Sequence, residues 1–219
     1  MKHTIDIEHW ERKEVFTFFQ DFADSSVSVT TEVECGPTFT LCKEKSSSFS
    51  LYCMYAVLKA ANEIPEMRTR IEEGGRQVCQ YDRIGVVTPI KVNEKGKFVE
   101  AYIDYEEDFS TFYKRGYEKI HSLDENSDPY EFVKSHPSYY GVMNISITPD
   151  LYFTAVRHTQ HYAYGDIFPL LNIGKAVQRE GRWVIPIAIT VNHALTDGHH
   201  LALFFKKIEA WLTRPQQLS

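Results

Sequence analysis

One stretch near the C-terminus constrains the fold of this chain more than any other. Residues Trp183 to Val191 are almost continuously apolar, with isoleucine and valine the commonest among them. A strand with apolar side chains on both sides is buried on both faces, which is typical of the centre of a sheet. We therefore expect a central, buried strand over Arg182–Asn192 that is followed at once by His193.

The remaining patterns predict both helices and further strands. Apolar residues at helical spacing predict helices over Trp10–Phe22, Phe49–Asn62, Glu66–Glu72, Asp108–Leu123 and Gly198–Leu212. Alternation and β-branched residues predict strands over Val27–Glu34, Gly85–Val92, Lys97–Tyr105, Val142–Thr148, Leu151–His158 and Phe168–Ala176. The polar segment Asp124–Tyr140 contains prolines and is expected to be irregular. This mixture predicts an α/β two-layer sandwich, a mixed β-sheet covered by helices.

Composition limits the size, the partners and the location of the protein. The 219 residues are 43% hydrophobic and contain no linker-like stretch, which favours a single domain over 1–219. The net charge is −6 and the cations are interspersed, so we expect no nucleic-acid surface. No apolar run reaches the roughly 18–20 residues that a membrane span needs. Met1–Asp6 lacks the apolar segment of a signal peptide.

The cysteines show no spacing typical of a metal site. Cys35, Cys42, Cys53 and Cys79 form no C-x-x-C pair. Because no secretory signal precedes them, they are expected to be reduced thiols of a cytoplasmic protein, and we expect no bound metal.

His193 is the strongest candidate for a catalytic side chain. It ends the buried strand and begins a short loop that leads through Asp197 and Gly198 into the last helix. Imidazole has the side-chain pKa best suited to general-base catalysis near neutral pH. Two interpretations stay open from these residues alone. His193 is a general base, or it is a hydrogen-bonded histidine at a strand end with Asp197 as the N-cap of the helix.

Landmarks along the chain resemble those of the chloramphenicol acetyltransferases. They are a W-x-R-x-E-x-F pattern, a helix-ending segment, an N-x-S-x-x-P strand and the H-x-x-x-D-G loop, which lie at Trp10–Phe16, Ala61–Arg68, Asn144–Pro149 and Val184–His200. The last pattern alone is also similar to that of the dihydrolipoyl acyltransferases. The order of all four along the chain is what identifies the first family.

The resemblance implies a reaction and a role for four residues. It implies that His193 removes a proton from the primary hydroxyl of chloramphenicol, which then attacks the thioester of acetyl-CoA directly. Ser146 matches the serine that donates a hydrogen bond to the oxyanion, although it would also suit an ordinary strand serine. Asp197 and Arg12 match a structural ion pair that ties the loop to the first helix. The cysteines match none of these landmarks.

The resemblance also implies a homotrimer with active sites at subunit boundaries. Its acceptor pocket corresponds to Phe19, Ser25, Phe98 and Asn172, and Lys175 corresponds to the coenzyme channel. Core packing for Phe19 and Phe98, and a solvent-exposed role for Lys175, are equally open. Asn192, Asn172 and Phe19 depart from the histidine, threonine and tyrosine usual in the family. The last two changes affect acceptor recognition, each by about 1 kcal/mol.

Two other functions compete with this one. A dihydrolipoyl acyltransferase core predicts lipoyl-bearing and subunit-binding segments before the core, and we expect no room for them before Trp10. A non-catalytic relative would bind small molecules or partners on the same scaffold. Such a relative has no need of both His193 and Ser146, so the sequence favours the enzyme.

Overall fold

The centre of the protein is strand β10 (Arg182–Asn192), and nine of its eleven residues are buried. The computed structural model describes residues 1–75, 77–135, 140–159 and 169–215. In it, β10 pairs antiparallel with β2 (Ser26–Glu34) on one side and with β8 (Leu170–Ile173) on the other. The predicted central strand is therefore confirmed.

A seven-stranded sheet extends from β10 in both directions. Its order is β2-β10-β8-β7-β5-β6, and the short β9 (Val177–Arg179) pairs with β10. Strand β7 (Val142–Ile147) is parallel to both β8 and β5 (Gly85–Lys91), and β6 (Phe98–Ile103) is antiparallel to β5. The sheet is thus mixed, as predicted.

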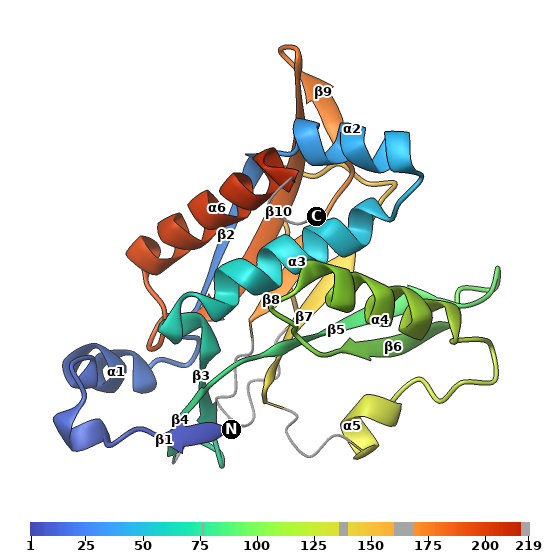
Figure 1. Cartoon of the computed structure of the whole chain (residues 1–219). Helices are drawn as coiled ribbons and strands as arrows, with labels where there is room; N and C mark the ends of the chain where they lie inside the picture. Colours follow the sequence, from blue (N-terminus) through green and yellow to red (C-terminus); the bar gives the residue numbers. More distant parts are fainter. Residues whose placement is uncertain (76, 136–139, 160–168, 216–219) are drawn as a thin grey trace.

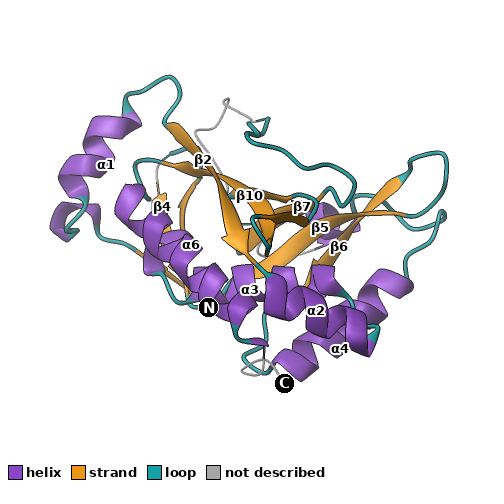
Figure 2. Ribbon diagram, turned by 90° about the horizontal axis from the view of Figure 1, so that it is seen from above, coloured by secondary structure: helices purple, strands orange, loops and turns teal. Residues whose placement is uncertain are grey.

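Four helices cover one face of this sheet, as Figure 2 shows. They are α2 (Gly36–Lys45), α3 (Phe49–Asn62), α4 (Phe109–His121) and α6 (Gly198–Thr213). Helix α3 begins where the Ser48 hydroxyl accepts a hydrogen bond from the Leu51 N–H, and ten of its fourteen residues are buried. The predicted two-layer α/β sandwich is confirmed.

A small second sheet and the first helix lie at one end of the molecule (Figure 1). It contains β1 (Lys2–Thr4), β4 (Gln77–Tyr81) and β3 (Thr69–Glu72). The short η1 (Ile7–His9) and α1 (Lys13–Gln20) lie beside it. A separate hydrophobic cluster joins these elements to the loop after β10, and it consists of buried Phe16, Val78, Ala194 and Leu195. This packing brings α1 against the loop that contains the candidate base.

Two predicted elements are wrong. The helix expected over Glu66–Glu72 is a 3₁₀ turn, η2 (Pro65–Arg68), followed by strand β3. Arg70 is buried there and donates hydrogen bonds of 2.9 Å to two carbonyls around the start of β7, which holds the segment extended. Residues Leu151–His158 form no strand. Phe153 of this segment packs against Gly174.

Other differences are shorter or unpredicted elements. The strand expected over Phe168–Ala176 is reduced to β8, and its first residue lies outside the described part of the chain. Helix α5 (Glu131–Ser135) lies in the segment expected to be irregular. Helix α2 and strands β1, β4 and β9 were not predicted. Among the described residues, none of the helices has the length and apolarity needed to cross a bilayer.

Candidate active site

The backbone of His193 is fixed by the strand beside it. His193 follows β10 directly, and its N–H donates a hydrogen bond of 2.7 Å to the Ser25 carbonyl just before β2. Its side chain is half-buried. The buried ring nitrogen is Nδ1, and no described group hydrogen-bonds to it. Nε2 is therefore the nitrogen that can face a substrate.

An aromatic ring from α1 fixes the plane of the imidazole. Phe19 stacks on His193 with ring centroids 4.2 Å apart and planes 10° apart. The Phe18 and Phe22 rings surround Phe19 at 5.1 and 5.3 Å and are 62% and 49% exposed. Phe19, predicted from the resemblance to line the acceptor pocket, thus contacts the candidate base itself, and two exposed aromatic rings adjoin it.

Arg12 and Asp197 hold the loop after His193. Arg12 Nη1 lies 3.0 Å from Asp197 Oδ2, and the two side chains are 15% and 36% exposed. Burial alone raises the pKa of the Asp197 carboxyl, but the Arg12 hydrogen bond, the His200 charge and backbone amides lower it below its ordinary value. Asp197 is also the N-cap of α6. The pair is only partly buried.

Ser146 and Asn172 lie side by side on neighbouring strands. Ser146 of β7 pairs in register with Asn172 of β8, and Asn172 pairs with Ala188 of β10. The Thr148 hydroxyl donates a 3.0 Å hydrogen bond to Asn172 Oδ1. Because that oxygen is occupied, Asn172 keeps its NH₂ group for another partner.

Within one chain, Ser146 and His193 lie far apart along the strand direction. Across the sheet, Ser146 is aligned through Asn172 with Ala188 of β10. Ala188 is five residues before His193. At about 3.4 Å per residue, the two side chains start about 17 Å apart along the strand direction. A reacting carbonyl must lie about 3 Å from both a base-activated hydroxyl and its oxyanion donor. One chain alone therefore brings these two side chains to no common substrate.

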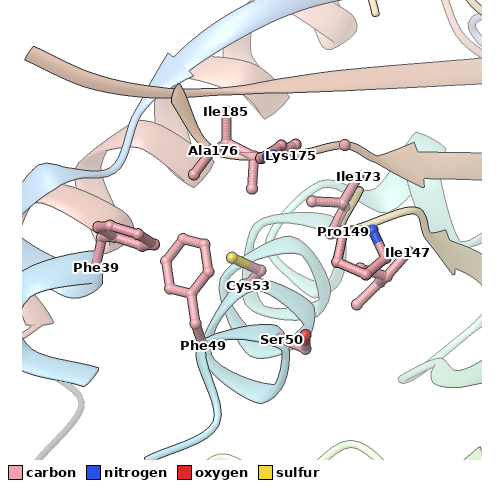
Figure 3. A pocket seen from close by; sticks show the side chains of 11 residues that line it. Phe39, Phe49, Ser50, Cys53, Ile147, Pro149, Ile173, Lys175, Ala176 and Ile185 are labelled. Carbon is pink, nitrogen blue, oxygen red and sulfur yellow. The ribbon is translucent and has the colours of Figure 1, made fainter. Parts of the chain in front are cut away.

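Two adjoining cavities lie at the Ser146 end. One of about 570 Å³ is lined by residues from five elements and loops, including Phe98 and Thr148, and Phe98 is 53% exposed. The other, of about 250 Å³, is shown in Figure 3. Both are lined by Ser50, Ile147 and Pro149, so they adjoin each other. The walls of both cavities are mostly apolar.

The smaller cavity has aromatic walls that were not predicted from the sequence. Phe39 of α2 and Phe49 of α3 pack edge to face on one side of it, with ring centroids 5.2 Å apart, and Lys175 and Ala176 also line it (Figure 3). The ammonium of Lys43 lies 4.4 Å from the Phe39 ring centroid. The sequence offered no signal for Phe39, because α2 has no clear apolar stripe. Lys175, which was predicted to lie at a coenzyme channel, lines this cavity.

Cys53 lines this cavity but is unsuited to nucleophilic catalysis. Burial raises the pKa of its thiol well above the ordinary value, and the neighbouring thiols raise it further. All four cysteines are free and buried. In the described ranges, no three His, Cys, Asp or Glu side chains are grouped so as to hold a metal ion.

A hydrogen-bonded chain on the uncovered face of the sheet was also not predicted. His158 Nδ1 lies 3.1 Å from the Thr190 hydroxyl, which lies 2.8 Å from the Ser28 hydroxyl. Burial lowers the pKa of His158 and favours its neutral form. Its Nε2 is buried without a hydrogen-bond partner among the described residues. Because Leu151–His158 was predicted to be a strand, His158 was not recognised as a candidate site residue.

The mixed sheet and its helices have counterparts among solved acyltransferase structures. The fold is similar to that of dihydrolipoamide acetyltransferase from Azotobacter vinelandii, with a TM-score of 0.65 and 13% identity over 88% of this chain and 83% of that one. The model of the chloramphenicol acetyltransferase family matches residues 1–209. The chain therefore belongs to this family and is an acetyl-transferring enzyme.

Individual relatives agree with this assignment. A chloramphenicol acetyltransferase from Clostridium perfringens is 25% identical, covering 94% of this chain and 92% of that protein. One from Staphylococcus intermedius is 24% identical, covering 95% and 98%. A solved structure described as chloramphenicol acetyltransferase is 49% identical with a TM-score of 0.91, covering 97% of this chain and 100% of that one.

Proposed function

We propose that the protein transfers the acetyl group of acetyl-CoA to the primary hydroxyl of chloramphenicol, with His193 as the general base. The observation that carries this proposal is the restraint of His193, whose backbone bonds to Ser25 while its ring stacks on Phe19. A rigid imidazole with one accessible nitrogen is suited to accept a proton from a bound hydroxyl. A cytoplasmic location and a role in antibiotic resistance follow from the proposal.

The reaction needs no covalent enzyme intermediate. His193 Nε2 takes the hydroxyl proton as the acceptor oxygen forms a bond to the thioester carbonyl carbon. The tetrahedral oxyanion accepts a hydrogen bond from Ser146, a contribution of about 2.7–4 kcal/mol at comparable sites. Collapse breaks the carbon–sulfur bond, and the proton on His193 passes to the departing thiolate of coenzyme A. The products are the acetyl ester and free coenzyme A.

Two copies of the chain are needed for this chemistry. The separation of about 17 Å between the Ser146 and His193 rows supports a site to which one subunit contributes His193 and its neighbour Ser146. Cyclic symmetry makes every such boundary equivalent. The resemblance to the family implies three subunits, so we propose a homotrimer with three active sites at its subunit boundaries.

The cavity in Figure 3 is the proposed coenzyme channel. Its apolar walls suit the pantetheine arm, and the exposed ammonium of Lys175 suits a phosphate of the coenzyme. The larger cavity adjoins it and is lined by Ile147 and Thr148, which directly follow Ser146 in the chain.

The acceptor pocket differs from the usual family pattern, and this supports an alternative. Asn172 offers an NH₂ group where a threonine is usual, and Phe19 lacks the usual tyrosine hydroxyl. Another hydroxyl acceptor is therefore the second candidate substrate. The third candidate function is that of a non-catalytic relative that binds small molecules. This function would not require His193 to be held in a fixed orientation.

Thiol release tests all three readings. Purified protein is mixed with acetyl-CoA and chloramphenicol, and free coenzyme A is followed with a thiol-reactive dye. We expect release that depends on chloramphenicol and falls by at least about 100-fold in His193→Ala. Mass spectrometry of the product locates the acetyl group. Release with other hydroxyl acceptors only would favour the second candidate. No His193-dependent release with any acceptor would support the binding relative.

A further inference from the structure

The backbone of Asp197 is held by the side chain of His200, which is in the first turn of α6. Nδ1 of His200 accepts a 3.2 Å hydrogen bond from the Asp197 N–H, and this contact completes a capping box. The His200 side chain is only 15% exposed. The imidazole is therefore packed against the candidate catalytic loop.

The other ring nitrogen of His200 points to a rigid part of the fold. Nε2 lies 3.5 Å from Glu66 Oε1 in η2, directly after the buried helix α3. The backbone on both sides of Glu66 is held, because its neighbour Met67 is fully buried and the Thr69 hydroxyl donates a 2.9 Å hydrogen bond to the Pro65 carbonyl. Glu66 thus connects His200 to the main hydrophobic core.

Arg12 and two backbone amides hold the Asp197 carboxylate. Arg12 contacts only Oδ2, through Nη1, while its Nε and Nη2 are buried and have no hydrogen-bond partner in the described chain. Oδ1 accepts hydrogen bonds from the N–H groups of His199 at 3.0 Å and of His200 at 3.4 Å. The His200 imidazole adds a hydrogen bond to the Asp197 backbone, and it is the side chain that links this loop to Glu66.

We propose that His200 is a positioning residue for His193. It acts through Asp197, and it ties the loop to the core through Glu66. The inference rests on the proposed function, in which His193 is the general base. A base must be held within hydrogen-bond reach of the acceptor hydroxyl, and small displacements reduce the rate strongly. His200 touches no reacting atom, and its effect is on geometry.

Two substitutions separate hydrogen bonding from packing at this position. Glutamine retains an acceptor for the Asp197 N–H and a donor toward Glu66, whereas leucine retains bulk and loses both. We expect His200→Leu to lower kcat about 10-fold with KM for acetyl-CoA within about 2-fold, and His200→Gln to stay within about 3-fold of wild type. The matched control is His199→Ala, which removes an exposed imidazole from the same turn and should keep kcat.

Thermal unfolding of each variant accompanies the kinetics. Equal kcat for leucine and glutamine variants, with only their unfolding temperatures lowered, would overturn the proposal, because His200 would then serve the fold alone. So would a loss confined to KM.

The imidazole signals of His193 in ¹⁵N-edited NMR spectra, assigned with His193→Ala, provide a readout that needs no turnover. We expect them to shift or broaden in His200→Leu and to resemble wild type in His200→Gln. If wild type fails to acetylate any acceptor, the proposed function fails, but the positioning role is still judged by these spectra. Unchanged His193 signals in His200→Leu would contradict it.

Discussion

The Phe19 ring lies parallel to the His193 imidazole, with their centroids 4.2 Å apart. The two residues come from opposite ends of the sequence, and α1 is held in place by its own small core around Phe16. One face of the imidazole is therefore covered, and rotation about its side-chain bonds is restricted. This contact connects the placement of a surface helix to the geometry of the proposed base.

Removing the Phe19 ring should lower turnover more than stability. Aromatic pairs contribute about 0.5–1.5 kcal/mol beyond the area they bury, which corresponds to a loss in kcat of about 2- to 10-fold in Phe19→Leu. Phe19→Tyr is the matched control, because it keeps the stacked ring and adds the hydroxyl usual in the family. Steady-state kinetics of both variants would check this. Equal kcat in leucine and tyrosine variants would show that stacking has no role in catalysis.

Asp197 should matter through its charge and through its cap, and two substitutions separate these. Asp197→Asn keeps an N-cap side chain but leaves Arg12 without its carboxylate, at a cost of about 1–3 kcal/mol for a partly buried pair. Asp197→Ala also loses the cap, about 1 kcal/mol more. Urea unfolding measures both costs. We expect activity to fall in both variants, so a stable Asp197→Ala enzyme with full turnover would exclude the anchoring role.

The lowered pKa of Asp197 gives its stabilising effect a defined pH range. The carboxylate is ionised in the folded and unfolded states above the unfolded pKa near 3.9, so its full contribution is present there. The contribution is lost as the pH falls through the lower folded-state pKa. The unfolding free energy of wild type minus that of Asp197→Asn should thus be constant above about pH 5 and shrink toward pH 3. A difference that grows on acidification would contradict this assignment.

The central strand and the long helices could be predicted because local signals and packing agree there. The strand predicted over Arg182–Asn192 and the helix predicted over Phe49–Asn62 match β10 and α3 at both ends. Prediction failed where tertiary contacts decide. The segment Thr69–Glu72 forms strand β3 because it pairs with β4 and because its Arg70 side chain is buried in the fold. The helical periodicity of Glu66–Glu72 gives no sign of either contact.

The candidate site shows the same division. His193 and Asp197 are close in sequence and in space, so their neighbourhood followed from one motif. His200 lies in the same motif, but its contact with Glu66 crosses between elements and carries no local signature. The separation of Ser146 from His193 required the strand order and register, which no pattern in the sequence provides.

Thr148 should determine whether Asn172 presents its NH₂ group or its oxygen to the acceptor. Its hydroxyl donates to Asn172 Oδ1, so Thr148→Val leaves that oxygen without its donor and frees the amide to turn. A misdirected amide changes one polar contact, worth about 1 kcal/mol. We expect KM for chloramphenicol to rise about 5-fold while KM for acetyl-CoA stays unchanged. Thr148→Ser, which keeps the hydroxyl, should behave like wild type, and a rise in both KM values would point to general distortion instead.

Mixed trimers offer the most direct test of a shared site. His193→Ala and Ser146→Ala are each expected to be nearly inactive. If His193 and Ser146 act within one chain, refolding the two variants together restores nothing. If they act across a boundary, a random mixture places an intact His193 against an intact Ser146 at about one boundary in four, given cyclic symmetry.

The mixture should then regain about a quarter of wild-type turnover, whereas each variant refolded alone provides the baseline. Size-exclusion chromatography of the mixed sample checks that trimers have formed. Trimers that form and stay at the baseline would contradict the shared site and would leave Ser146 outside the chemistry of His193.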